Sequence, residues 1–177
     1  GNLKIKQNKN EEAKNLFILA IKINGNLVPP KFSLAAFYEQ SGNFDEAKKL
    51  YYEILKTNPN FTNADKSISL IHKYKENDEH LKMMEKKSNE NISSEAMRSL
   101  NFALGKAYED IGNYEKSFKF YENGNKLFKK DINYDLKLEN EYFQKIKEIS
   151  ENKIHDLKSY GQKIIFVVGM PRSGTTL

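Results

Sequence analysis

The chain has 177 residues, of which 38% are hydrophobic and 30% are charged, and it contains no cysteine. This composition suits a soluble, helix-rich chain of one ordinary domain, or one domain with part of another, and it excludes disulfides and thiolate metal sites. The net charge of +5, from 29 basic and 24 acidic residues, is too small and too dispersed to indicate a nucleic-acid partner.

The segment from Val28 to Phe61 has the residue pattern of two short helices joined by a turn. Small residues at Ala35 and Ala47 would let the helices approach, and tyrosines would fill the space beside them. The segment resembles a tetratricopeptide repeat, a helix–turn–helix unit of about 34 residues. The residues that carry this resemblance are Leu34, Ala35, Tyr38, Gly42, Ala47, Tyr51 and Pro59.

The same pattern recurs from Arg98 to Lys130, with its turn glycine 70 positions (112 − 42) after the first, or about two repeat lengths. We therefore expect Val28 to Lys130 to be almost entirely helical, in antiparallel pairs, with Tyr38 and Tyr108 in equivalent packing environments. The matching residues are Leu104, Gly105, Tyr108, Gly112, Ser117 and Tyr121.

A degenerate unit is expected between these repeats, from Thr62 to about Met97. It has apolar residues at helical spacing but no turn glycine, and Lys86 to Ser94 has the composition of a polar loop. These apolar residues are Ile68, Ile71, Leu81 and Met84. His72, His80 and His155 are scattered, without the spacing that a metal site needs.

At the N-terminus, Ala13 and Phe17 align with a second repeat helix, and Gly1 falls at the small-residue position of a first one. We therefore expect the chain to start inside a repeat. From Ile132 to Ile149 the pattern predicts a further helix that solvates or caps the array. Residues 1–150 are thus interpreted as a tetratricopeptide-like α-solenoid, and residues 151–162 as a linker.

The last stretch begins with five apolar residues, Ile164 to Val168, which suit a buried parallel strand. Gly169 permits a sharp turn, and a helix start is expected to follow. Backbone N–H groups at such a helix start bind phosphate well, and Arg172 can add a charged fork. The candidate phosphate-binding residues are Arg172, Ser173, Gly174, Thr175 and Thr176.

The sequence from Pro171 to Leu177, PRSGTTL, resembles the 5′-phosphosulfate loop of sulfotransferases, in the form found in the tyrosylprotein sulfotransferase group. The resemblance implies that residues 163–177 begin an α/β sulfotransferase domain that binds PAPS (3′-phosphoadenosine 5′-phosphosulfate) without a metal. Arg172 would stabilise charge on the phosphosulfate, and Ser173 to Thr176 would hold the 5′-phosphate. The acceptor would be a hydroxyl, with protein tyrosine as a candidate.

In that family the general base and the 3′-phosphate site lie downstream of this loop. We therefore expect a sulfotransferase as the full-length parent, and no activity from this chain alone. Two alternatives remain. Gly169 and Gly174 also match the spacing of a P-loop kinase or NTPase, although Thr175 replaces the lysine of that motif. The other alternative is a tetratricopeptide protein-interaction module with no catalytic role.

We expect a protein or peptide partner on the repeat surface. No apolar run approaches the length of a membrane span, so no membrane partner is expected. No signal peptide is visible, and the absence of cysteine is compatible with a reducing compartment, which predicts a cytoplasmic location.

Overall fold

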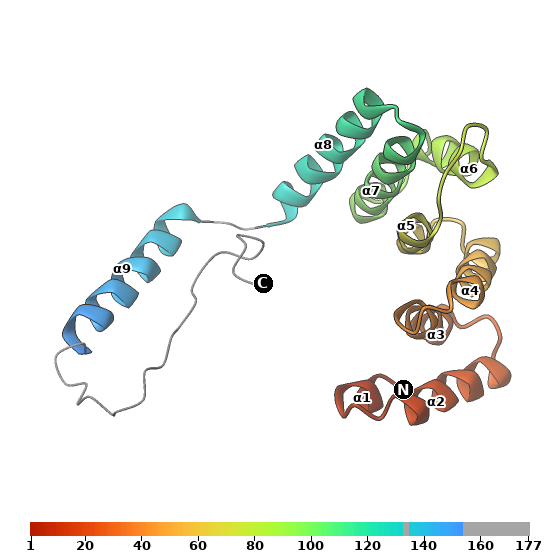
Figure 1. The fold of residues 1–177 in the computed structure, drawn as a ribbon, viewed down its shortest axis with the longest axis horizontal. Helices are drawn as coiled ribbons and strands as arrows, with labels where there is room; N and C mark the ends of the chain where they lie inside the picture. The colour runs from red at the N-terminus through yellow and green to blue at the C-terminus, as the bar shows by residue number, and fades with distance from the viewer. Residues whose placement is uncertain (133–134, 154–177) are drawn as a thin grey trace. The chain divides into compact units, whose positions relative to one another are not determined.

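The computed structural model of the chain describes residues 1–132 and 135–153, and over these residues helix is the only regular secondary structure (Figure 1). The chain divides into two compact units, Gly1–Asn133 and Tyr134–Leu177. No described helix is both long and apolar enough to cross a membrane. The first unit contains α1 (Asn2–Lys6), α2 (Asn10–Ile23), α3 (Val28–Gln40), α4 (Phe44–Thr57), α5 (Thr62–Ile71), α6 (Glu79–Ser88), α7 (Ser94–Ile111) and α8 (Tyr114–Asp131), and the second contains α9 (Leu136–Lys153).

Small residues let paired helices of the first unit approach closely. A Cβ atom added at Gly105 in α7 would stand 2.8 Å from the Tyr121 ring of α8, which is closer than real Cβ contacts allow. Ala35 and Tyr51, also 16 positions apart, are both fully buried in one core cluster of α3, α4 and α5. Gly1 likewise lies against the ring of Phe17, 16 positions later. The predicted pairing of small and aromatic positions is therefore confirmed.

The turn inside each helical repeat is made by a residue in the left-handed backbone region. Gly42 and Gly112 have φ values of 75° and 84°, while Asn8 and Asn77 have values of 57° and 65°. These four residues are separated by 34, 35 and 35 positions. Asparagine is one of the few residues besides glycine that visits this region readily. The two repeats without a turn glycine therefore keep the repeat period by using asparagine instead.

A hydrogen bond between the paired helices is also repeated. The Tyr51 hydroxyl donates to Glu39 across α3 and α4 at 2.8 Å, and the Tyr121 hydroxyl donates to Glu109 across α7 and α8 at 3.0 Å. Both partners shift by 70 positions from one pair to the other. This equivalence supports the predicted antiparallel packing of the two matched repeats.

Tyr38 and Tyr108, which we expected to be equivalent, share their backbone setting but not their ring contacts. The Tyr38 carbonyl accepts from the Asn43 amide at 2.8 Å, and the Tyr108 carbonyl accepts from the Asn113 amide at 2.9 Å. The Tyr38 ring is half-buried, whereas the Tyr108 ring is buried and stacks on Phe120. The prediction therefore holds for the backbone and only partly for the side chains.

The unit between the two matched repeats departs from their geometry. Its first helix, α5, ends at Ile71, and an irregular segment leads to α6, which packs on α7. Tyr74, in that segment, is only 2% exposed. The predicted loop from Lys86 to Ser94 is wrong at its end, because Ser94 begins α7, and at its start, because Lys86 to Ser88 belong to α6. The physical reason is Lys87, whose side chain is buried and ion-paired with Asp65.

The helix predicted from Ile132 to Ile149 begins later and ends later. Ile132 is the C-cap residue of α8, and α9 runs from Leu136 to Lys153. The sequence places this helix with the repeats, whereas the structure places α9 in the second unit. Its candidate apolar-face residues within the described range are all exposed: Leu138, Tyr142, Phe143, Ile146 and Ile149. The expected strand and phosphate loop lie outside the described residues.

Candidate functional site

A groove runs along α8, and we refer to it as the α8 groove. The helix α6 ends at Ser88 after 10 residues, whereas α7 and α8 each have 18, and α7 lies between the other two (Figure 1). Two adjoining hollows of about 480 and 360 Å³ open beside α8. They share Ser88, Phe120 and Asn123 in their lining, so they lie next to each other along α8.

The floor of the α8 groove is largely aromatic and apolar. The rings of Tyr108 and Phe120 stack with centroids 5.5 Å apart and planes inclined by 7°. Met97 and Leu127 continue this lining in the second hollow, beside the amide of Asn101. Amide and hydroxyl groups around an apolar floor can bond a polypeptide backbone while its side chains pack below.

Lysines dominate the charge of the α8 groove. Lys116 and Lys119 line the first hollow and Lys126 lines the second. Glu85 is the single carboxylate among the lining residues of these two hollows, and it accepts a hydrogen bond from the Tyr108 hydroxyl. Burial and the adjacent Glu85 raise the pKa of Tyr108 to about 12, so this hydroxyl remains a hydrogen-bond donor at neutral pH.

The groove lysines already have local partners, which are exposed glutamates for Lys119 and Lys126 and the buried Tyr108 ring for Lys116. Lys119 pairs with Glu115 at 2.7 Å and Lys126 pairs with Glu122 at 3.0 Å, each across one exposed helix turn. The Lys116 ammonium lies 4.8 Å from the centroid of the Tyr108 ring. Exposed pairs of this kind are weak and are screened by salt. The lysines can therefore exchange these partners for a bound ligand at little cost.

A buried polar network joins α5 to α6, and we refer to it as the Asp65 network. The Asp65 carboxylate is fully buried and accepts from Lys87 Nζ at 2.6 Å and from His80 Nε2 at 3.1 Å. The other ring nitrogen of His80 lies 2.7 Å from the Tyr74 hydroxyl. A neutral imidazole with its hydrogen on Nε2 satisfies both contacts, because Nδ1 then accepts from Tyr74.

The Asp65 network has a structural role rather than a catalytic geometry. Within the described residues, no buried side-chain nitrogen or oxygen lacks a hydrogen-bond partner. Neither Asp65 nor His80 is among the residues that line the described hollows. A general base needs access to the proton that it removes. The described part of the chain also has no group of three or more potential metal ligands.

A second polar cluster, around Asp110, connects α7 to the segment that directly follows α5. Its carboxylate accepts from Lys106 at 2.6 Å, from Lys73 at 2.7 Å and from the Tyr74 backbone amide at 3.2 Å. Burial opposes ionisation of Asp110, but the hydrogen bonds from Lys106 and Lys73 outweigh it, so the pKa of Asp110 lies below its ordinary value. The Tyr74 backbone amide, which lies beyond the end of α5, thus has a hydrogen-bond acceptor in Asp110.

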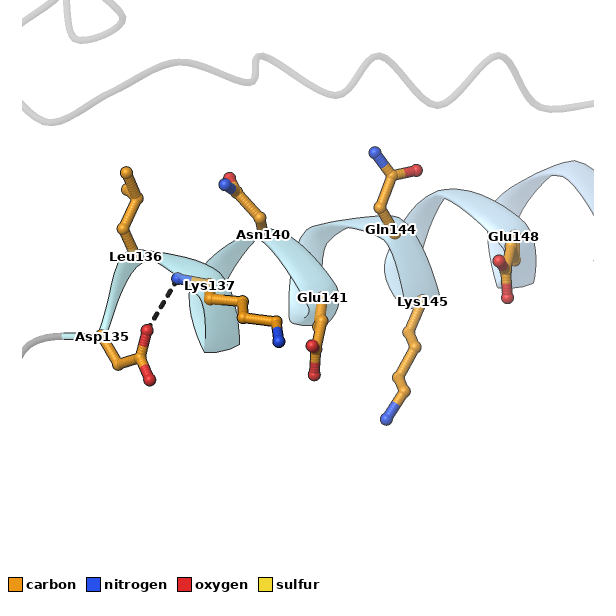
Figure 2. A pocket seen from close by; sticks show the side chains of 8 residues that line it. All are labelled: Asp135, Leu136, Lys137, Asn140, Glu141, Gln144, Lys145 and Glu148. Carbon is orange, nitrogen blue, oxygen red and sulfur yellow. Dashed lines mark hydrogen bonds between the residues drawn. The ribbon is translucent and has the colours of Figure 1, made fainter.

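Polar side chains on one face of α9 surround a further hollow, shown in Figure 2. The Asp135 carboxylate accepts from the Lys137 backbone amide at 2.8 Å, next to the start of α9. Every lining residue belongs to α9 or directly precedes it, and one helix cannot enclose a ligand. These residues are Asp135, Leu136, Lys137, Asn140, Glu141, Gln144, Lys145 and Glu148.

The residues predicted to bind phosphosulfate, Arg172 to Thr176, lie outside the described residues. The sequence interpretation missed the α8 groove and the Asp65 network. It treated His72 and His80 as scattered, yet both rings contact Tyr74, with centroids 4.7 and 5.9 Å from it. A usable signal was the run of lysines in α8 at positions 116, 119 and 126, which share a helix side with Phe120.

Comparisons with known proteins identify the repeats. The family model of the tetratricopeptide repeat matches residues 30–61 and 99–131. An uncharacterized protein of Aquifex aeolicus (strain VF5) is 32% identical over 141 residues, which cover 77% of this chain and 18% of that protein. The chain therefore spans less than a fifth of the length of this relative. The solved structure "MamA MSR-1 C2" aligns over 73% of both chains with a TM-score of 0.45 and 14% identity.

Proposed function

We propose that this chain is a protein-interaction module that holds an extended polypeptide segment in the α8 groove. The observation that carries the proposal is the pair of adjoining hollows beside α8, lined by the stacked rings of Tyr108 and Phe120 and by Ser88 at the end of α6. Two tetratricopeptide repeat matches support the same function class, because stacked repeats provide extended binding surfaces.

The dimensions of the groove suit a short segment. Its α8 lining extends from Lys116 to Leu127, which corresponds to about 16 Å along a helix axis. An extended chain covers that distance with about five residues. Side chains on one side of such a segment would meet Phe120, while Ser88 and Asn123 would face its backbone or polar groups.

A displayed library of random heptapeptides, selected against the full chain, tests this proposal. We expect the selected peptides to shift the NMR signals of Ser88, Phe120 and Asn123. The variant Asn123→Trp would fill the groove and weaken their binding at least tenfold. Asn125→Trp is the matched control, since Asn125 is exposed on the same helix but does not line either hollow. Peptides that bind equally well to both variants would overturn the proposed site.

A second candidate function is sulfuryl transfer by the full-length protein, and the single observation favouring it is the sequence Pro171 to Leu177. In that proposal, Arg172 stabilises negative charge on the phosphosulfate of PAPS as the bridging bond breaks. The loop from Ser173 to Thr176 holds the 5′-phosphate, and the repeats recruit the acceptor protein.

The test is transfer of labelled sulfate from PAPS by protein expressed from the complete reading frame, with ATP as the control donor. We expect Arg172→Ala to lower turnover by about 10²–10³-fold, the usual cost of losing one preorganised electrostatic group. Arg172→Lys should recover part of the activity, because it restores the charge without the planar fork. Undiminished transfer by Arg172→Ala would remove this role, and phosphate transfer from ATP alone would indicate a kinase.

A further inference from the structure

We infer that the segment held in the α8 groove is acidic. This inference rests on the proposed function and adds the chemistry of the partner. The lining carries three lysines, Lys116, Lys119 and Lys126, against one carboxylate, Glu85, for a net charge of +2 (3 − 1). Because Glu85 is already bonded to the Tyr108 hydroxyl, its remaining capacity to attract a basic partner is reduced.

The spacing of the lysines also defines the form of the partner. Lys119 and Lys126 are seven residues apart, two turns of α8, which is about 10.5 Å along the helix. In a polyproline II segment, residues three apart lie on one side at a separation of about 9.3 Å. Two carboxylates in a Glu-x-x-Glu arrangement would therefore reach both lysines, while an apolar residue between them packs on Phe120.

The present partners of these lysines do not prevent such binding. Glu115 and Glu122 are one helix turn before Lys119 and Lys126, and all four side chains are largely exposed. Exposed pairs of this kind contribute little to stability, so a ligand carboxylate can replace either glutamate at little cost.

Two synthetic heptapeptides test the inference on the full chain. One carries Glu-Leu-Ala-Glu at its centre, and the other has both glutamates replaced by glutamine. We expect the acidic peptide to bind in the groove at least tenfold more tightly at low ionic strength, with the difference shrinking as salt is added. Binding is measured by fluorescence anisotropy, and its location by NMR shifts of Phe120 and Asn123.

A pair of double variants separates groove charge from overall charge. Lys119→Gln with Lys126→Gln should abolish most of the preference for the acidic peptide. Lys129→Gln with Lys130→Gln removes the same charge from the same helix outside the groove lining, and it should leave the preference unchanged within about twofold.

The outcomes distinguish this inference from the proposed function. Equal binding of both heptapeptides in the groove would overturn the acidic partner and leave the groove as a peptide site. Equal loss of preference in both double variants would also overturn it, since diffuse charge would then explain the attraction. If neither heptapeptide binds and the library yields no groove ligand, the proposed function fails together with the inference.

Discussion

The pair α3–α4 and the pair α5–α6 occupy successive positions in the same array, but they fill the space between their helices differently. In the first pair, Ala35 and Tyr51 are fully buried in one apolar cluster. In the second, the position 35 residues after Tyr51 is Lys86, which is exposed. The ring that fills this region comes from Tyr74, in the irregular segment between the helices, and it bonds to His80.

The repeat period therefore survives the loss of apolar contacts within a helix pair. Gly42 and Asn77 make equivalent turns 35 positions apart. The helices on either side of Asn77, α5 and α6, are joined by the polar Asp65 network. The same departure shortens α6 to 10 residues, and the shorter helix leaves the α8 groove open. The least regular unit thus borders the candidate functional site.

The largest effect is expected at the charge pair of the α5–α6 unit. Asp65→Ala would leave the Lys87 ammonium buried without a partner, and we expect a loss of about 3–5 kcal/mol in unfolding free energy. In the α3–α4 pair, Tyr51→Phe removes only the hydrogen bond from the Tyr51 hydroxyl to the half-buried Glu39, with an expected cost of about 0.5–1.5 kcal/mol. Urea denaturation of both variants measures the difference.

The double variant Asp65→Ala with Lys87→Met serves as the control for this prediction. It removes the uncompensated charge along with its partner, so much of the lost stability should return. If Asp65→Ala lowers the unfolding free energy no more than Tyr51→Phe does, then the α5–α6 pair does not depend on its buried charge pair for stability.

The sequence predicts the matched repeats well because their contacts are encoded locally. Small and aromatic residues lie 16 positions apart, as at Gly105 and Tyr121, and glycine marks two of the four turns. The middle unit is harder to predict because asparagine replaces the turn glycine. Its interior also depends on Asp65 and Lys87, which are 22 positions apart and resemble ordinary surface charges in the sequence.

The lysines of α8 mark the α8 groove only weakly in the sequence. Lys119 and Lys126 have the spacing of a solvated helix face, and their pairs with preceding glutamates are common on exposed helices. What makes the groove is the early end of α6 at Ser88. That end depends on tertiary packing, and the loop predicted from Lys86 placed it three residues too early. The phosphosulfate loop from Arg172 to Thr176 stays a prediction from the sequence.

The next largest effect is expected where α7 and α8 approach most closely. Gly105→Ala would push a methyl group against the Tyr121 ring, and overpacking of this kind costs about 1–3 kcal/mol. Gly25→Ala is the control, because a Cβ atom there would make only an ordinary contact 3.8 Å from the Ile21 carbonyl. Thermal denaturation that ranks the two variants equally would contradict the close pairing of α7 and α8.

A smaller effect tests whether the turns of the two kinds of unit are equivalent. Gly112→Ala and Asn77→Ala each place alanine in the left-handed region, and each should cost about 1 kcal/mol. Asn77→Gly should change stability by less than about 0.5 kcal/mol, because glycine accepts this conformation without strain. Chemical denaturation measures all three variants. A larger loss for Asn77→Gly than for Asn77→Ala would show that the asparagine side chain has another role.

The smallest effect concerns acid. It tests the carboxylate of Asp110 in α7, which accepts a hydrogen bond from the Tyr74 backbone amide in the segment between α5 and α6. The pKa of Asp110 is lowered in the folded chain, where burial is outweighed by Lys106 and Lys73. The stability that this group contributes is therefore fully present above its ordinary pKa of 3.8 and is lost as pH falls through the lower folded-state value.

We expect wild type to lose its stability advantage over Asp110→Asn below about pH 4. Added salt should reduce that advantage, because Lys73 is exposed. Unfolding measured from pH 2 to 7 tests this, with Asp45→Asn as the control for charge count, since Asp45 is an exposed residue of α4. An advantage over Asp110→Asn that persists unchanged at pH 2 would show that hydrogen bonding to Tyr74, rather than the ionised carboxylate, fastens the end of α5 to α7.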